Sequence, residues 1–147
     1  MKTLVINDSD IKIETKKLES WVKKVSAVLK KKQLLTPLQE KQELVLVFLN
    51  EKEAKRLNWS YREKDYPTDV LSFESDDPSG FGELVMCPQV LKKQAPEQKH
   101  TFEQETQYMI LHGMLHLLGF DHERGKDEEK KMFDLQNEIF QSLTKSK

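Results

Sequence analysis

The segment from His112 to His122 constrains the fold more than any other part of the chain, because it holds three of the four histidines within eleven residues. His112 and His116 are four residues apart, so in an α-helix their imidazoles project from one face, about 40° apart and about one turn apart along the axis. Gly119 then supplies a residue suited to the left-handed conformation that ends many helices. The chain would turn there and return His122 to the same side. We therefore predict a helix end at which three imidazoles converge.

Such a convergence predicts a metal site. Three neutral imidazoles suit zinc, and three protein ligands leave a fourth position open for water, as in catalytic zinc sites. Imidazole also binds other divalent ions, so Ni²⁺ is an alternative to Zn²⁺. A lone histidine in an apolar segment usually packs in the core or lies at the surface, but three at this spacing favour one bound ion. The predicted ligands are His112, His116 and His122, which hold one ion per chain.

The overall charge gives no sign of a nucleic-acid protein. Lys and Arg number 24 against 25 Asp and Glu, for a net charge of −1, whereas nucleic-acid-binding domains are usually basic. Binding of a nucleic acid would therefore rest on a local patch. The 147 residues fit one domain, 1–147, that can bury a sizeable core.

Cysteine content and apolar patterning predict a cytoplasmic location. Cys87 is the only cysteine, so no disulfide framework is expected. We interpret Cys87 as a small core residue or a helix-start neighbour. No run approaches the ~18 apolar residues of a membrane span, and acidic residues such as Asp8 come too early for a signal peptide. A membrane partner is therefore not expected.

Helical and strand patterns alternate along the chain, which predicts an α+β or α/β fold with helices packed around one small mixed sheet. We expect about four strands in the sheet and about five helices around it. Strand patterns cover residues 4–6, 11–13, 43–49, 70–73 and 82–87, and helical patterns cover 15–32, 51–58, 88–94, 101–118 and 127–143. Residues 34–42 are expected to be a connector, and 59–69 to be largely loop.

Two strand predictions are more specific. The run 43–49 is almost continuously apolar, which is typical of a strand covered on both faces. The strands 70–73 and 82–87 flank a short connection and are expected to pair antiparallel. Asn50 is expected to cap the helix over 51–58, which follows the strand over 43–49.

The helix over 101–118 is the predicted centre of the fold. Thr101 and Gln104 form a capping box at its start, and its second half is apolar nearly all round, as in a buried helix. The metal histidines would then stand on the most rigid element available.

Six lysines of the first helix recur opposite its apolar stripe. Their simplest interpretation is a solvated face, and the alternative is a track for phosphates that would not read sequence. Both interpretations stay open at this point. The six are Lys16, Lys17, Lys23, Lys24, Lys30 and Lys31.

The histidine spacing matches that of metzincin proteases, whose motif is His-Glu-x-x-His-x-x-Gly-x-x-His. A protease of that type uses the glutamate after the first histidine as its general base. Here that position is Gly113, which has no side chain. A metallopeptidase is therefore retained only as an alternative.

Three blocks of the chain resemble the bacterial YbeY family of rRNA-maturation endoribonucleases. The blocks are His-Gly-Met-Leu-His-Leu-Leu-Gly-Phe-Asp-His at 112–122, Tyr-Arg-Glu-Lys-Asp-Tyr-Pro-Thr-Asp-Val-Leu-Ser-Phe at 61–73 and Gly-Glu-Leu-Val-Met-Cys-Pro at 82–88. Their order, separations and the overall length also agree. One departure is Glu83, where the family usually has Asp.

This resemblance implies an activity and a set of site residues. His112, His116 and His122 would be zinc ligands, and Arg62 would face the RNA as the catalytic residue. The family is described as metal-dependent and specific for single-stranded RNA. Its members act in rRNA processing, including maturation of the 3′ end of 16S rRNA, and in quality control of the small ribosomal subunit. The implied partners are rRNA, the small subunit and assembly factors, and not DNA.

The chemistry of the residues is compatible with that activity. A metal with an open position lowers the pKa of bound water, and a guanidinium such as that of Arg62 can hold phosphate oxygens in pairs. Judged by itself, Arg62 would be taken for a surface arginine. Asp121 either orients a histidine or caps the turn. Tyr61 and Tyr66 either stack on unpaired bases or, in the favoured interpretation, pack in the core.

Two points complete the predictions. His100 lies outside the histidine cluster and is interpreted as a surface residue. The main alternative to an enzyme is a ribosome-assembly module that binds RNA without cleaving it, in which the metal only holds the fold together.

Overall fold

Four strands form one mixed sheet in the order β1-β2-β4-β3 in the computed structural model, which describes residues 1–122 and 124–144. Strands β1 (Lys2–Asn7), β2 (Glu43–Phe48) and β4 (Gly80–Met86) run parallel, and β3 (Val70–Phe73) pairs antiparallel with β4. The predicted mixed sheet of an α+β fold and the antiparallel pairing of its last two strands are therefore confirmed.

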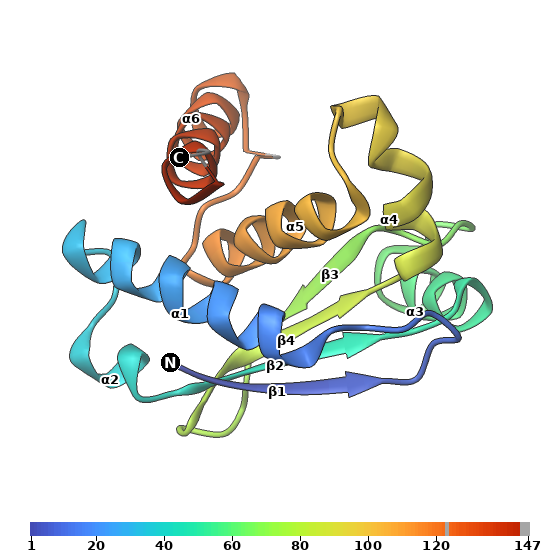
Figure 1. Cartoon of the computed structure of the whole chain (residues 1–147), viewed down its shortest axis with the longest axis horizontal. Helices are drawn as coiled ribbons and strands as arrows, with labels where there is room; N and C mark the ends of the chain where they lie inside the picture. The colour runs from blue at the N-terminus through green and yellow to red at the C-terminus, as the bar shows by residue number, and fades with distance from the viewer. Residues whose placement is uncertain (123, 145–147) are drawn as a thin grey trace.

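Helices cover one face of this sheet. Helices α1 (Thr15–Lys31) and α5 (Phe102–Leu117) lie side by side over the strands, and α6 (Lys126–Thr144) packs on α1 and α5 (Figure 1). Helices α3 (Glu51–Arg62) and α4 (Pro88–Gln94) follow β2 and β4 at one end of the sheet, and a short 3-10 turn spans Pro96–Gln98. The short α2 (Pro37–Glu40) lies between α1 and β2.

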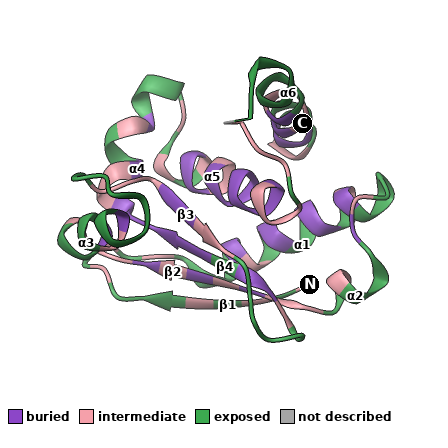
Figure 2. Cartoon of the chain, turned by 180° about the vertical axis from the view of Figure 1, so that it is seen from behind, coloured by how far each residue is buried: buried purple, intermediate pink, exposed green. Residues whose placement is uncertain are grey.

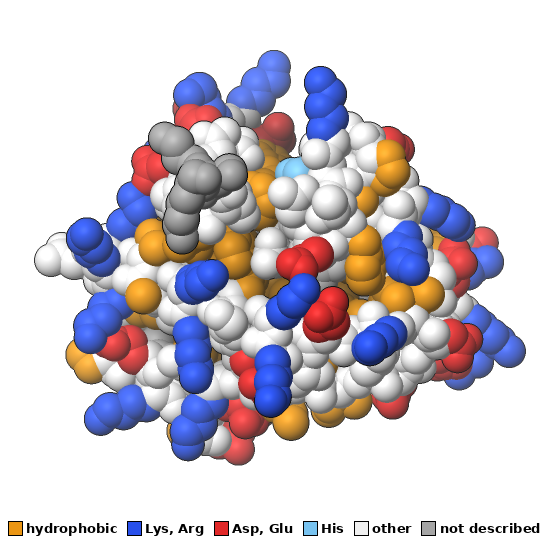
Figure 3. All heavy atoms as spheres, viewed as in Figure 1, with side chains coloured by type: hydrophobic (Ala, Val, Ile, Leu, Met, Phe, Trp, Pro, Cys, Tyr) orange, Lys and Arg blue, Asp and Glu red, His pale blue; other side chains and the backbone are white. Residues whose placement is uncertain are grey.

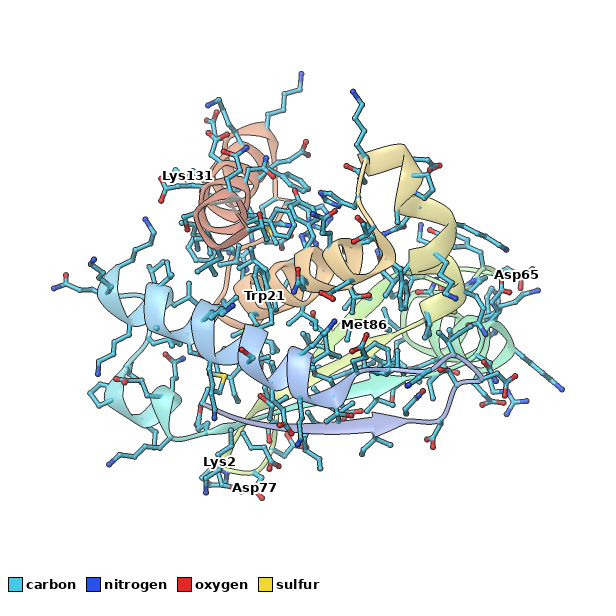
Figure 4. The ribbon with its side chains drawn as sticks, viewed as in Figure 1. Lys2, Trp21, Asp65, Asp77, Met86 and Lys131 are labelled. Carbon is cyan, nitrogen blue, oxygen red and sulfur yellow. The ribbon has the colours of Figure 1, made fainter. Side chains whose placement is uncertain are left out.

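The core lies between the helices and the covered face of the sheet. Buried residues gather on the facing sides of α1, α5 and α6, whereas the edge strand β1 has only exposed and half-buried residues (Figure 2). Trp21 joins three helices: its Nε1 donates to the backbone carbonyl of Gln107 in α5 at 2.9 Å, and its ring meets that of Phe140 in α6 at 5.9 Å (Figure 4).

Strand β2 is covered fully on one face only, so the prediction of two covered faces is wrong. Leu44, Leu46 and Phe48 are fully buried, whereas Val45 and Val47 between them are half-buried. The second face receives partial cover because β2 is flanked by β1 and β4, whose side chains stand beside its own. The apolar run 43–49 is therefore explained by the central position of β2 in the sheet, and not by a second layer of helices.

Several other local predictions were wrong. Residues 11–13 form no strand: the chain bends over 9–11, and just before 11–13 the backbone amide of Asp10 donates to Asn50 Oδ1 at 3.0 Å. The same Asn50 side chain does not cap α3, because its oxygen is engaged there and by Gln89. The connector 34–42 contains α2, which Thr36 and Gln39 open with a capping box. Helix α3 continues to Arg62 instead of ending near Asn58.

Helix α5 matches its prediction closely. Thr101 and Gln104 form the capping box at its start. At its end Gly119 has a φ of 101°, its amide donates to the carbonyl of His116, and the amide of Phe120 donates to the carbonyl of Leu115. This pair of bonds is the Schellman arrangement, which reverses the chain after a helix.

The face that carries α1 has mixed charge. Lysine and arginine side chains are spread over it among acidic ones (Figure 3). The six lysines of α1 are all exposed; Lys17 pairs with Glu14 and Glu103, and Lys30 with Glu40. Within residues 1–122 and 124–144, no helix is both long and apolar enough to cross a membrane.

Candidate metal centre and cleft

A cleft of about 880 Å³ opens between α5, β3, α6 and the last turns of α3 and α4. It contains the three histidines of the cluster together with Arg62, so the structure brings together all four residues singled out from the sequence. Among its other lining residues are Tyr61, Asp69, Phe73, Gln94, Glu105, Tyr108, Asp121 and Phe133.

The three imidazoles converge as their spacing predicted. His112 and His116 lie one turn apart on α5, and the Schellman turn brings His122 back beside them. The ring centroids of His112, His116 and His122 are 4.6, 5.0 and 5.2 Å apart in pairs. One nitrogen from each ring lies within 4.8 Å of the other two. These three residues can therefore hold one metal ion.

A glutamine on α6 determines which nitrogen of His112 faces the cluster. Gln136 Oε1 lies 2.8 Å from His112 Nδ1, and Gln136 Nε2 donates to the backbone carbonyl of Tyr108 at 3.4 Å. Because an amide oxygen only accepts, His112 Nδ1 carries the proton, and its Nε2 is left with a lone pair. That Nε2 lies 3.1 Å from His116 Nε2. Gln136 is fully buried, so this orientation is well held.

Burial keeps two of these imidazoles neutral. It lowers the pKa of His116 to about 4, with smaller contributions from the neighbouring His112 and His122. Burial likewise lowers the pKa of His112, against the opposing effects of Gln136 and Asp69. Neutral imidazole is the form that binds metal, so no proton has to be displaced from these rings at neutral pH.

The residues present fit a zinc-like ion. Metal–nitrogen bonds of about 2.0–2.1 Å in a tetrahedral site separate two ligand nitrogens by ~3.3 Å, close to the 3.1 Å between the Nε2 atoms of His112 and His116. The donors are three imidazoles, and the second nitrogen of His112 is held by a hydrogen-bond acceptor, as is usual for metal-binding histidines. The donor set also suits other divalent ions.

Gly113 has a structural role that the comparison with proteases did not anticipate. A Cβ at this position would lie 2.5 Å from Cδ2 of Leu84, a fully buried residue of β4. The glycine therefore allows α5 to pack closely against the sheet. A glutamate here would have to displace the buried side chain of Leu84, so the packing of α5 on β4 disfavours the peptidase base at this position.

Arg62 and Tyr61 reach the cleft from the last turn of α3. The helix ends immediately after Arg62, where Glu63 takes a left-handed conformation with a φ of 56°. The buried Asn58 donates through Nδ2 to the backbone carbonyl of Tyr66 at 2.8 Å and so fastens the loop that follows. Arg62 is thus an exposed helix residue rather than a loop residue.

The core-packing interpretation of the two tyrosines is wrong. Tyr61 is 65% exposed and Tyr66 is 53% exposed. Tyr61 lines the cleft and meets the ring of Phe73, which ends β3, edge to face at a centroid distance of 4.9 Å. The interpretation of Cys87 as a core residue at a helix start is confirmed, since it is buried and precedes α4 directly.

A second polar network forms part of the cleft wall. Gln94 Nε2 donates to Asp69 Oδ2 at 3.2 Å and to Glu105 Oε2 at 2.6 Å, and Glu105 Oε1 pairs with His100 Nδ1 at 2.7 Å. Glu105 is 1% exposed and the side chain of His100 is 17% exposed. The interpretation of His100 as a surface residue is therefore wrong. It is a partner of a buried carboxylate.

Asp121 directly precedes His122 and also lines the cleft. Its Oδ2 is 3.3 Å from Arg124 Nε, and its charge raises the pKa of His116, although burial has the larger and opposite effect. Whether its main role is to orient a histidine or to cap the turn stays a prediction.

Gln136 is the functional side chain that the sequence analysis missed. It stands on the apolar stripe of α6 with Met132, Ile139 and Phe140, all of them buried. A polar residue at such a position is a signal for a buried hydrogen bond. Its partner on α5 lies 24 residues away in the sequence, so only the packing of the two helices identifies it.

Comparison with known proteins places the chain in a family of nucleases. The model of the family described as Endoribonuclease YbeY matches residues 4–144. The Endoribonuclease YbeY of Bdellovibrio bacteriovorus is 46% identical over 145 residues, covering 99% of this chain and 97% of its own length. That of Petrotoga mobilis is 36% identical over 151 residues, covering 100% and 99%.

A solved structure has a similar fold. The solution structure of TM1509 from Thermotoga maritima superposes with a TM-score of 0.64 at 30% identity, covering 96% of this chain and 88% of that one. The chain belongs to the YbeY endoribonuclease family. The prediction of a hydrolase of the endonuclease class is thereby confirmed.

Proposed function

We propose that this chain is a zinc-dependent endoribonuclease that cleaves single-stranded rRNA in the cytoplasm. In this proposal His112, His116 and His122 hold the ion, and Arg62 binds the phosphate that is cleaved. The substrates include the 3′ end of 16S rRNA, and the enzyme acts in quality control with the small ribosomal subunit and its assembly factors. One observation carries the proposal: three convergent imidazoles and an arginine line one cleft.

Each residue has a definite task in this proposal. When bound, the ion would act as a Lewis acid that polarises a phosphoryl oxygen and lowers the pKa of a water bound to it. Gln136 holds His112 with its Nε2 directed at the site. The guanidinium of Arg62 is always charged and binds two phosphate oxygens at once, which stabilises the negative charge that grows on them during cleavage.

The burial of the histidines and the exposure of Arg62 suit these two tasks. The imidazoles of His112 and His116 stay neutral because burial lowers the pKa of both, as metal binding requires. Arg62 lies at the rim, where a long, charged substrate approaches first. The net charge of −1 for the chain means that phosphate recognition depends on such local groups and not on a general basic surface.

The test is cleavage of defined RNAs by the purified protein. A single-stranded fragment spanning the 3′ end of a 16S rRNA precursor should be cut, and the same sequence annealed to its complement should not. A chelator should abolish cleavage, and Zn²⁺ should restore it better than Ni²⁺ or Mn²⁺. Equal cleavage with and without the chelator would contradict the metal dependence. Tight RNA binding without any cleavage would support the binding-module alternative.

A further inference from the structure

We propose that Tyr61 is a stacking platform for an unpaired nucleobase of the RNA strand whose phosphate Arg62 binds. The inference rests on the proposed function and adds a base-binding position to it. The chemical class of the ligand is a purine or pyrimidine ring in a single strand.

The ring of Tyr61 is held in place but remains open. Tyr61 is 65% exposed although it lines the cleft. Within residues 1–122 and 124–144 its ring meets only that of Phe73, at a centroid distance of 4.9 Å and an interplanar angle of 70°. An edge-to-face contact covers at most one face of a ring, so at least one face of Tyr61 is available.

The support beneath this ring is rigid. Phe73 ends β3, which is hydrogen-bonded to β4, so the contact ties the last turn of α3 to the sheet. Asn58 fastens the loop beyond that turn. A preset ring loses little conformational entropy on binding, which favours it as a stacking surface.

Position in the cleft identifies the ligand. Tyr61 and Arg62 are consecutive residues and both line the cleft that contains the three histidines. Successive bases and phosphates alternate along a nucleic-acid strand, so an aromatic ring beside a phosphate-binding arginine suits one nucleotide. Aromatic side chains stack on bases only where the bases are unpaired. This arrangement would therefore favour single strands over duplexes without reading sequence.

Trp59 provides a matched control. It lies two residues earlier on α3 and is 57% exposed, but it is not among the described residues that line the cleft. Two positions on a helix are about 200° apart, so the two rings project in nearly opposite directions. A general effect of exposed aromatic rings on RNA binding would appear with both residues, whereas stacking in the cleft would appear with Tyr61 alone.

The experiment combines protein variants with a modified RNA in steady-state cleavage by the metal-loaded enzyme. In Tyr61→Ala, the KM for single-stranded RNA should rise about tenfold with kcat changed by less than about twofold. Tyr61→Phe and Trp59→Ala should behave as wild type. Tyr61→Leu, which retains apolar bulk without a π-face, should behave as Tyr61→Ala. Thermal unfolding verifies that each variant is folded.

RNAs with one abasic nucleotide, placed in turn at each position around the mapped cleavage site, identify the stacked base. At one position the loss of the base should raise the KM of the wild type by the same factor and leave that of Tyr61→Ala unchanged. If Tyr61→Ala matches the wild type, or if its loss persists equally on every abasic RNA, the stacking inference is overturned while the nuclease stands. If the wild type cleaves no RNA, the proposed function fails first.

Discussion

The wall of the cleft formed by His112, His116 and His122 is buried or half-buried, whereas the rim at the last turn of α3 is exposed. His112 is 7% exposed and fastened by Gln136, which is itself fully buried. Tyr61 and Arg62 project toward solvent from a helix end. The difference suits the proposed tasks of the two groups: a metal site needs ligands of fixed geometry, and a site for a long polymer needs groups that the polymer can reach.

This contrast also predicts how each wall responds to change. Substitutions on the histidine wall should alter metal content together with activity, because the ligands and their supports act as one unit. Substitutions at the rim should alter activity on RNA and leave the metal and the stability unchanged.

His116→Ala should produce the largest effect. Loss of a ligand should lower the zinc content to near zero and reduce cleavage by more than about 100-fold, since loss of a ligand's support alone costs about 10–100-fold. His116 is only half-buried, so the folded state should persist, as circular dichroism would show. Unfolding of this variant, with RNA binding lost in proportion, would instead support a metal that only holds the fold together.

Arg62→Ala should reduce kcat/KM for RNA by about 10²–10³-fold, the range found when one group that stabilises transition-state charge is removed. Its zinc content and unfolding midpoint should equal those of the wild type. Arg56→Ala is the matched control, because Arg56 is an exposed arginine of the same helix that pairs with Glu53. A loss of zinc from Arg62→Ala would show that the two walls are not independent.

Gln136→Met should lower zinc affinity by about 10–100-fold, because His112 loses the acceptor that orients it. Gln136→Glu keeps an acceptor of similar size and should retain most of the affinity. Competition with a chromophoric chelator measures both values. Equal affinities for Gln136→Met and the wild type would mean that helix packing alone positions His112.

Stability of the metal-free protein should fall as the pH falls from about 6.5 toward about 4. The pKa of His116 is lowered from 6.5 to about 4 in the folded chain, first by burial. In that interval the unfolded chain takes up a proton that the folded chain does not, so acid favours unfolding. His116→Gln should flatten this dependence in urea unfolding measured near pH 7 and near pH 5. An identical dependence in both proteins would contradict a neutral His116.

The lysines of α1 should have the smallest effect. Lys23 and Lys24 are exposed and, within the described residues, do not line the cleft. Replacing both with glutamine should change kcat/KM for RNA by less than about twofold, as is usual for surface sites. A larger loss together with a reduced salt dependence of binding would favour the phosphate track, which stays open as an alternative.

The success and failure of the sequence analysis follow the range of the interactions concerned. The capping box of α5, the turn at Gly119 and the three converging histidines depend on residues a few positions apart, and each was predicted correctly. The errors at Asn50 and His100 concern side chains whose partners belong to other elements. The error at Tyr61 concerns a ring that the tertiary structure leaves exposed. Asn50 looked like a cap, but its amide bonds Asp10 and Gln89, each about 40 residues away.

The sequence by itself determined the convergence of three imidazoles at the candidate metal centre, because a helix of constant pitch followed by a helix-ending glycine leaves His112, His116 and His122 little choice of arrangement. It also contained the blocks that resemble the family. Only the tertiary structure decided what surrounds that centre: the support from Gln136, the closeness of α5 to β4 at Gly113, and the placing of Tyr61 and Arg62 across the cleft. Those contacts join residues distant in the chain, and their geometry depends on how whole elements pack.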